Sequence, residues 1–252
     1  MTIIMPVRAL FAAWALLLFC AASPAAPARA QEMSPQQRRT IEGIVHDYLL
    51  NNPQVLIDAL RSAERKLDSD AKEKAASTIA DRRSEIFDDP ATPVGGNKHG
   101  DISLVEFFDY QCPYCKHVQP SLERLAKKDK GLRLVYKEFP ILGPVSVVAA
   151  RAALAARLQG KYDTFHAAMM ARTGHLADDT VYEVAASVGI DVARLKRDMT
   201  SPQIAADLKA NRALARKLDI TGTPAFVIGH RIIPGAVSLD DLRQLVADAR
   251  KG

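Results

Sequence analysis

The chain has 252 residues, with 34 lysines and arginines against 29 aspartates and glutamates, and a formal net charge of +5. It contains no long basic run and no interleaving of aromatic with basic residues, which argues against nucleic acid binding. Hydrophobic residues make up 48% of the chain, which is enough to bury the cores of one or two domains.

Residues 1–30 have the pattern of an export signal that is cleaved near Ala30. The segment opens with one positive charge and no acid, continues with 14 apolar residues (9–22), and ends in the small-x-small pattern Ala28-Arg29-Ala30. A membrane anchor is the alternative, but a spanning helix needs roughly 20 apolar residues. Removing this segment takes away two arginines and Cys20, which leaves a net charge of +3 and two cysteines. We therefore expect an exported protein in an oxidising compartment.

Residues 31–90 are predicted to form a helical segment ahead of the main domain. Ser34-Pro35-Gln36-Gln37 is a capping box with proline at the first helical position, so a helix should begin here. Large apolar residues then recur on one face of this helix: Ile41, Ile44, Val45, Tyr48 and Leu49. Asn51-Asn52-Pro53 ends it, and a second helix with a narrow, alanine-rich apolar stripe should run from about Pro53 to Phe87. We expect residues 34–87 to be an oligomerisation stalk; a solvated linker helix is the alternative.

The main domain is expected to span residues 91–252 and to begin with a strand–helix–strand unit. Pro93-Val94-Gly95-Gly96 reads as a loop into this domain. Residues 102–108 read as a buried strand, a helix opens at Cys112 and runs to about Lys128, and residues 132–139 form a second strand. Strands connected through a helix in this way are parallel.

The rest of the domain is helical before strands return. Residues 145–218 have a helical pattern that is broken at four places: Gly160, Gly174, Gly189 and Pro202. Short strands follow at residues 225–228 and 231–233, and Ser238 begins a last helix. The predicted order is βαβ, several helices, then ββα, which is an α/β fold.

Cys112 and Cys115 form the Cys-Pro-Tyr-Cys motif that carries the chemistry. A nucleophilic cysteine must be a thiolate, and a helix N-terminus favours this form through its unpaired N–H groups and dipole. Pro113 suits the first turn because its missing N–H is no loss there. We therefore expect Cys112 to attack a substrate disulfide and Cys115 to resolve the mixed disulfide. A zinc half-site, a structural disulfide or two idle thiols are alternatives, and zinc would require a second pair of ligands.

The run from Phe107 to Lys116, together with Gly222-Thr223-Pro224-Ala225-Phe226, resembles the DsbA family of bacterial periplasmic thioredoxin-fold enzymes. The resemblance covers about residues 94–252. It implies a thioredoxin fold capped by an inserted helical domain at about residues 145–218, and location in the periplasm. We expect no bound cofactor.

The resemblance also implies roles for residues around the cysteines. Thr223-Pro224 should have a cis peptide bond beside the pair, and with Pro113 and Tyr114 it should bind an extended substrate segment. Glu106, six residues before Cys112, matches the family's buried acid and would relay a proton to Cys115. An ordinary trans proline and a surface glutamate are the alternatives.

The N-terminal segment with Tyr48-Leu49-Leu50-Asn51-Asn52-Pro53 resembles that of the suppressor-of-copper-sensitivity C (ScsC) proteins within this family. The resemblance implies a homo-oligomer, a trimer, that acts as a disulfide isomerase and contributes to copper tolerance. Its expected partners are cysteine-containing exported proteins and a membrane thiol–disulfide redox partner. A reductase, a DsbA-like dithiol oxidase, a periplasmic Cu(I)-binding chaperone using the same thiolates, and a non-catalytic adaptor remain open.

Two histidines and two methionines in the helical region, and one lysine on the second strand, could also have functional roles. His166, His175, Met169 and Met170 could suggest copper binding, but we expect them to be packing residues and predict no metal site. Lys137, near the end of the second strand, could reach the region of the acid and the thiols.

Overall fold

The computed structural model describes residues 33–251, and the predicted export signal therefore lies outside the described residues. The chain divides into two compact units after Ser62. Within the described residues, no helix is both long enough and apolar enough to cross a membrane.

Helix α1 (Pro35–Asn51) begins where the capping box predicts. The backbone N–H of Gln37 donates to Ser34 Oγ at 3.2 Å, and the backbone N–H of Ser34 donates to Gln37 Oε1 at 2.9 Å, so two otherwise unpaired donors are satisfied. At the other end, the side chain of Asn52 donates to the carbonyl of Tyr48. No residue of α1 is buried. Large apolar side chains of residues 33–62 are exposed: Ile41, Ile44, Val45, Tyr48, Leu50, Val55, Leu56, Ile57 and Leu60.

Helical structure starts at Pro53 and ends at Phe87 as predicted, but the expected single helix is two helices. Helix α2 (Pro53–Asp81) ends at a break at Arg82, and the short helix α3 (Arg83–Phe87) follows. The break permits Ile79 of α2 and Ile86 and Phe87 of α3 to be buried in the same core under the sheet. The backbone N–H of Arg82 still donates to the carbonyl of Thr78, and that of Ile86 to the carbonyl of Arg82, so helical hydrogen bonds remain on both sides of the break.

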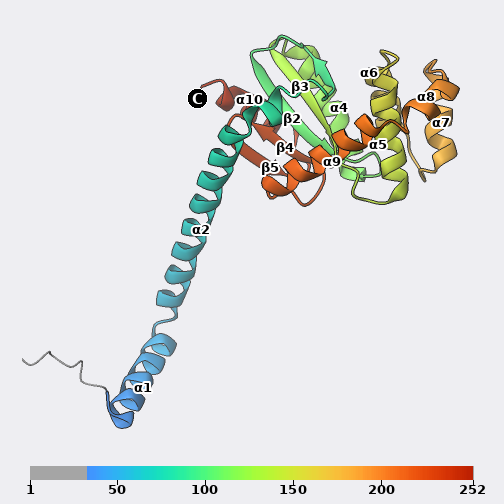
Figure 1. The fold of residues 1–252 in the computed structure, drawn as a ribbon. Helices are drawn as coiled ribbons and strands as arrows, with labels where there is room; N and C mark the ends of the chain where they lie inside the picture. Colours follow the sequence, from blue (N-terminus) through green and yellow to red (C-terminus); the bar gives the residue numbers. More distant parts are fainter. Residues whose placement is uncertain (1–32, 252) are drawn as a thin grey trace, which may run out of the picture. The chain divides into compact units, whose positions relative to one another are not determined.

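A five-stranded sheet with the order β1-β3-β2-β4-β5 forms the centre of the second unit (Figure 1). Strands β2 (Ile102–Phe108) and β3 (Leu132–Glu138) are parallel, as predicted. Strand β4 (Ala225–Ile228) pairs antiparallel with β2, and β5 (Arg231–Pro234) pairs antiparallel with β4 at the edge of the sheet. This arrangement confirms the thioredoxin-type fold.

Strand β1 (Val94–Gly96) pairs antiparallel with β3, whereas the sequence predicted a loop there. Gly95 and Gly96 suggested a loop, but both allow the backbone of β1 to pack closely against β3. A Cβ on Gly95 would lie 2.8 Å from the ring of Tyr136, and one on Gly96 would lie 2.7 Å from the carbonyl oxygen of Leu132. Glycine is therefore required for the chain to approach β3 so closely.

Helices cover both faces of the sheet. On one face, α4 (Pro113–Lys128) and α10 (Leu239–Ala249) pack against side chains such as Leu104 and Phe108. The opposite face, with Val105 and Phe107, packs against α3 and α9. The inserted helices are α5 (Pro144–Arg157), α6 (Tyr162–Ala171), α7 (Asp178–Ser187), α8 (Val192–Asp198) and α9 (Pro202–Lys217). They confirm the predicted insertion, and α5 to α8 gather beside the sheet in Figure 1.

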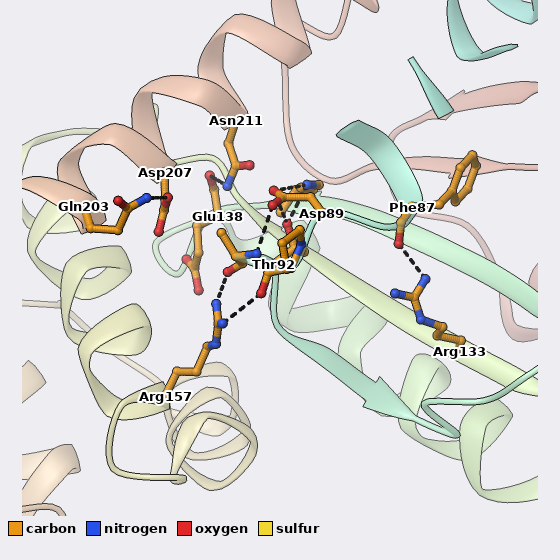
Figure 2. Close-up of polar contacts among 12 residues, drawn as sticks. Phe87, Asp89, Thr92, Arg133, Glu138, Arg157, Gln203, Asp207 and Asn211 are labelled. Atoms are coloured by element: carbon orange, nitrogen blue, oxygen red, sulfur yellow. Dashed lines mark hydrogen bonds and ion pairs between the residues drawn. The ribbon is translucent and has the colours of Figure 1, made fainter. Parts of the chain in front are cut away.

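Lys137 lies on the face of the sheet away from Glu106, so the suggestion that it reaches the acid and the thiols was wrong. Its partner across β2 is Phe107, and its Nζ lies 3.1 Å from Asp89 Oδ2 and 2.5 Å from Thr92 Oγ1. Asp89 and Thr92 belong to the segment between α3 and β1. Arg157 binds this segment too, because its guanidinium donates to the carbonyls of Pro90 and Ala91 (Figure 2). Lys137 therefore fastens the segment that leads from α3 to β1.

Candidate functional site

Cys112 is the N-cap residue of α4, and Pro113 occupies the first turn, as predicted. The backbone of Cys112 has an extended conformation, and its carbonyl accepts from the N–H of Lys116. Both cysteines are free thiols. Cys112 is 3% exposed and Cys115 is fully buried, whereas Tyr114 between them is 64% exposed. The helix start therefore places one sulfur at the positive end of the α4 dipole and the other beneath it.

The segment Thr223–Pro224 lies against Cys112, although 111 residues separate Thr223 from Cys112 in the chain. The Cys112 thiol donates to the carbonyl oxygen of Thr223 at 3.2 Å. The peptide bond between Thr223 and Pro224 is cis, as the resemblance implied. Pro224 is buried and leads directly into β4. The structure thus brings Cys112, Pro113, Thr223 and Pro224 to one place.

Glu106 is buried beneath the cysteine pair. It is 2% exposed, and neither carboxyl oxygen has a hydrogen-bond partner among the described residues. Burial without a partner raises its pKa to about 8, because the charged form is poorly solvated there. Burial also raises the pKa of the Cys115 thiol, and the charge of Glu106 raises it further. The acid and the resolving thiol are therefore electrostatically coupled.

A second buried acid, Glu138, lies on the same face of the sheet and was not predicted. Its Oε1 accepts from the hydroxyls of Tyr162 at 2.8 Å and Tyr110 at 3.1 Å. Burial raises its pKa, and Glu106 is among the nearby charges that raise it further. Alternation along β3 could have revealed it, since Tyr136 and Glu138 share a face and Tyr136 pairs with Glu106.

His166 belongs to this buried network. Its Nδ1 lies 3.1 Å from the hydroxyl of Tyr110, and its ring stacks on Tyr162. Burial lowers its pKa to about 3, so it is neutral at ordinary pH. Met169 and Met170 are buried, whereas His175 is exposed. Among the residues that the structure describes, no group of three or more His, Cys, Asp or Glu side chains could hold a metal ion.

Asp109 stabilises the turn between β2 and Cys112. Its role was not predicted from the sequence. Its carboxylate accepts from the backbone N–H groups of Ile141 and Leu142 and from the hydroxyl of Ser146 at 2.7 Å. Its own carbonyl accepts from the backbone N–H of Cys112. The end of β2 is thereby tied to the segment that precedes α5. A single aspartate next to an aromatic run carried no signal of this role.

Two families match the chain. The DSBA-like thioredoxin domain matches residues 103–247, and the copper resistance protein ScsC N-terminal domain matches residues 37–66. Together they cover the site described above and most of the described residues of the first unit.

Several solved structures are similar. A thioredoxin-like oxidoreductase from Silicibacter pomeroyi is 46% identical, with a TM-score of 0.66 over 68% of this chain and 98% of that one. A linker-deletion mutant of Proteus mirabilis ScsC is 26% identical, with a TM-score of 0.68 over 88% of this chain and 99% of that one. Salmonella enterica BcfH is 28% identical, with a TM-score of 0.74 over 85% of this chain and 96% of that one.

Curated relatives have a similar level of identity to the ScsC and BcfH structures. NhaA 1, an Na(+)/H(+) antiporter of Salinispora arenicola, is 27% identical over 161 residues, and this chain spans a quarter of its length (63% of this chain, 25% of the antiporter). The thiol:disulfide interchange protein DsbA of Bordetella parapertussis is 27% identical over 63% of this chain and 82% of that protein. The first family covers more than half of the chain, which therefore belongs to the DsbA-like thioredoxin family and carries an ScsC-type N-terminal segment.

Proposed function

We propose that the protein is a periplasmic thiol–disulfide oxidoreductase that acts on cysteines of exported proteins through Cys112 and Cys115. One observation carries the proposal: Cys112 Sγ sits at the start of α4, 3.2 Å from the carbonyl of Thr223. The start of a helix is a position typical of reactive cysteines, and the neighbouring backbone can hold a substrate strand in reach.

The exchange has two steps. The Cys112 thiolate attacks one sulfur of a substrate disulfide, the S–S bond breaks, and the other substrate sulfur leaves as a thiolate. Cys115, once deprotonated, attacks Cys112 and releases the substrate thiolate, so the enzyme is oxidised and the substrate reduced by two electrons. In isomerisation a substrate thiolate attacks the mixed disulfide instead and regenerates the Cys112 thiolate without net electron transfer. Oxidation is the reverse of the two reductive steps.

Glu106 is the proposed proton relay for Cys115. A buried thiol loses its proton only to a nearby acceptor, and a carboxyl with a pKa of about 8 exchanges protons readily near neutral pH. Both groups are cut off from solvent, so the proton released by Cys115 passes to Glu106 as Cys115 attacks. Thr223, Pro224, Pro113 and the exposed Tyr114 form the proposed substrate-binding surface.

We also propose that residues 34–87 assemble the protein into a trimer that favours isomerisation. The support is the row of exposed large apolar side chains on α1 and the start of α2, together with the match to the ScsC N-terminal domain. Several active sites around one cleft keep a mispaired substrate bound between attacks. Residues 1–30 are the proposed export signal, and a membrane thiol–disulfide protein is the proposed redox partner.

The test is refolding of a scrambled-disulfide protein by the mature chain, with mass in solution recorded alongside. An Ile44→Glu, Leu60→Glu variant places charges on side chains that are exposed in this chain, so folding should persist while the oligomer dissociates. Leu158→Glu, at the exposed apolar C-cap residue of α5, is the control. Loss of isomerase activity with the oligomer supports the assignment. An oligomer-independent activity would identify a dithiol oxidase or reductase with a linker helix.

Copper binding is the second candidate, because the matched N-terminal family is described as a copper resistance protein. Two thiolates could bind Cu(I) as soft ligands. Replacing Cys115 separates the two functions. An oxidoreductase would accumulate mixed disulfides with its substrates, whereas a chaperone would only bind copper more weakly.

A further inference from the structure

A cleft of about 690 Å³ opens beside the cysteine motif, between the first turns of α4 and the segment that follows α6. Gln111 and Pro113, the two neighbours of Cys112 in the chain, are among its lining residues. Its other walls come from residues 170–176, where the buried side chains of Met170 and Leu176 lie. A substrate held at Cys112 therefore has this cleft directly next to it.

The cleft is basic. Lys116, His117, Arg172 and His175 line it, and none of its lining residues is acidic. Lys116 Nζ donates to the backbone carbonyl of Arg172 at 2.6 Å, so this lysine is held in place by a neutral group. Within residues 33–251, neither Lys116 nor Arg172 forms an ion pair with a carboxylate.

The positive charges of Lys116 and Arg172 repel each other. Burial lowers the pKa of Lys116, and the charge of Arg172 lowers it further. An anion in the cleft would relieve this repulsion and accept hydrogen bonds from both groups. The cleft beside β1 differs, because Glu123 and Asp163 lie there among its lysines and already supply negative charge.

We propose that this basic cleft is a subsite for acidic side chains that flank the reactive cysteine of the substrate; the proposal rests on the exchange activity proposed above. An extended chain advances about 3.3 Å per residue, so side chains two or three positions from the substrate cysteine lie about 7–10 Å away. Gln111 and Pro113, on either side of Cys112 in the chain, both line the cleft, so side chains at these positions of the substrate are the ones placed to enter it. The subsite would select substrates by charge and speed their encounter with Cys112.

The test uses the reduced mature chain and three short peptides. Each peptide has one cysteine, joined in a disulfide to the same pyridinethiol, and differs only in flanking Glu, Gln or Lys residues. Attack of Cys112 on the peptide sulfur breaks the disulfide, releases the pyridinethiol, and leaves the peptide on Cys112 until Cys115 displaces it. The rate of pyridinethiol release is the measurement.

We expect the Glu peptide to react about tenfold faster than the Lys peptide at about 20 mM salt, and the ratio to shrink towards one at about 1 M. Arg172→Glu should abolish or reverse this preference. Arg197→Glu, at an exposed arginine on α8 with the same change in net charge, should retain it.

Equal rates for the Glu and Lys peptides at low salt would overturn the subsite. So would a preference that survives Arg172→Glu, or one that Arg197→Glu abolishes equally, since the effect would then be absent from the cleft or due to net charge. In each of these cases the Gln peptide still reports exchange activity. Failure of the Gln peptide to react would instead overturn the proposed activity, and the subsite with it.

Discussion

Replacing Glu106 by glutamine should remove a pH-dependent loss of stability. The pKa of Glu106 is about 8 in the folded protein, against an ordinary value of 4.5. Below pH 4.5 the carboxyl is protonated in both the folded and the unfolded state. As the pH rises to 8 the unfolded chain loses this proton first, so the free energy of unfolding falls by about 1.4 kcal/mol per pH unit and levels off after about 5 kcal/mol.

The assay is urea unfolding of the reduced protein between pH 5 and pH 9, comparing wild type with Glu106→Gln. The glutamine is also buried without a partner, but its cost does not depend on pH. We therefore expect the free-energy difference between the two proteins to shift in favour of the variant by about 2.5 kcal/mol from pH 5 to pH 7. Glu183→Gln, at an exposed glutamate on α7, is the control. Parallel curves for wild type and Glu106→Gln would refute the burial argument.

Two further substitutions test the thiol pair and the opposite face of the sheet. Cys115→Ser should trap mixed disulfides between Cys112 and substrate proteins, detected by non-reducing electrophoresis and mass spectrometry, and none should form in a Cys112→Ser, Cys115→Ser variant. Asp89→Ala should lower the free energy of unfolding by about 3 kcal/mol, because it leaves the buried charge of Lys137 without its ion-pair partner. Asp88→Ala, at an exposed neighbour, should cost much less in the same urea titration, and equal losses would contradict the assigned role of the ion pair.

The elements around the cysteines could be predicted because local patterns determine them. The apolar run of β2 and the Cys112-Pro113 start of α4 signal a strand and a helix start without reference to the rest of the chain. The break at Arg82 could not be predicted, since the helical spacing of apolar residues continues past it. It arises from tertiary packing, which buries Ile79 and Ile86 together.

The buried polar residues were harder to predict than the reactive ones. Asp109 and His166 acquire their roles from groups distant in the chain, so no local pattern marks them. Glu106 was predicted only through a family resemblance. Glu138 could have been inferred once β2 and β3 were paired in register, because alternation then places it on the face of Glu106.

The register of β2 and β3 also bears on the proton relay proposed for Glu106. Phe107, and not Glu106, lies opposite Lys137, so the only buried lysine of the described residues pairs with Asp89 on the far face. Had Lys137 faced Glu106, its charge would have stabilised the carboxylate and held the pKa of Glu106 well below neutral. The acid would then remain ionised and raise the pKa of Cys115 without taking its proton. The alternation that separates Lys137 from Glu106 is therefore a condition for the proposed relay.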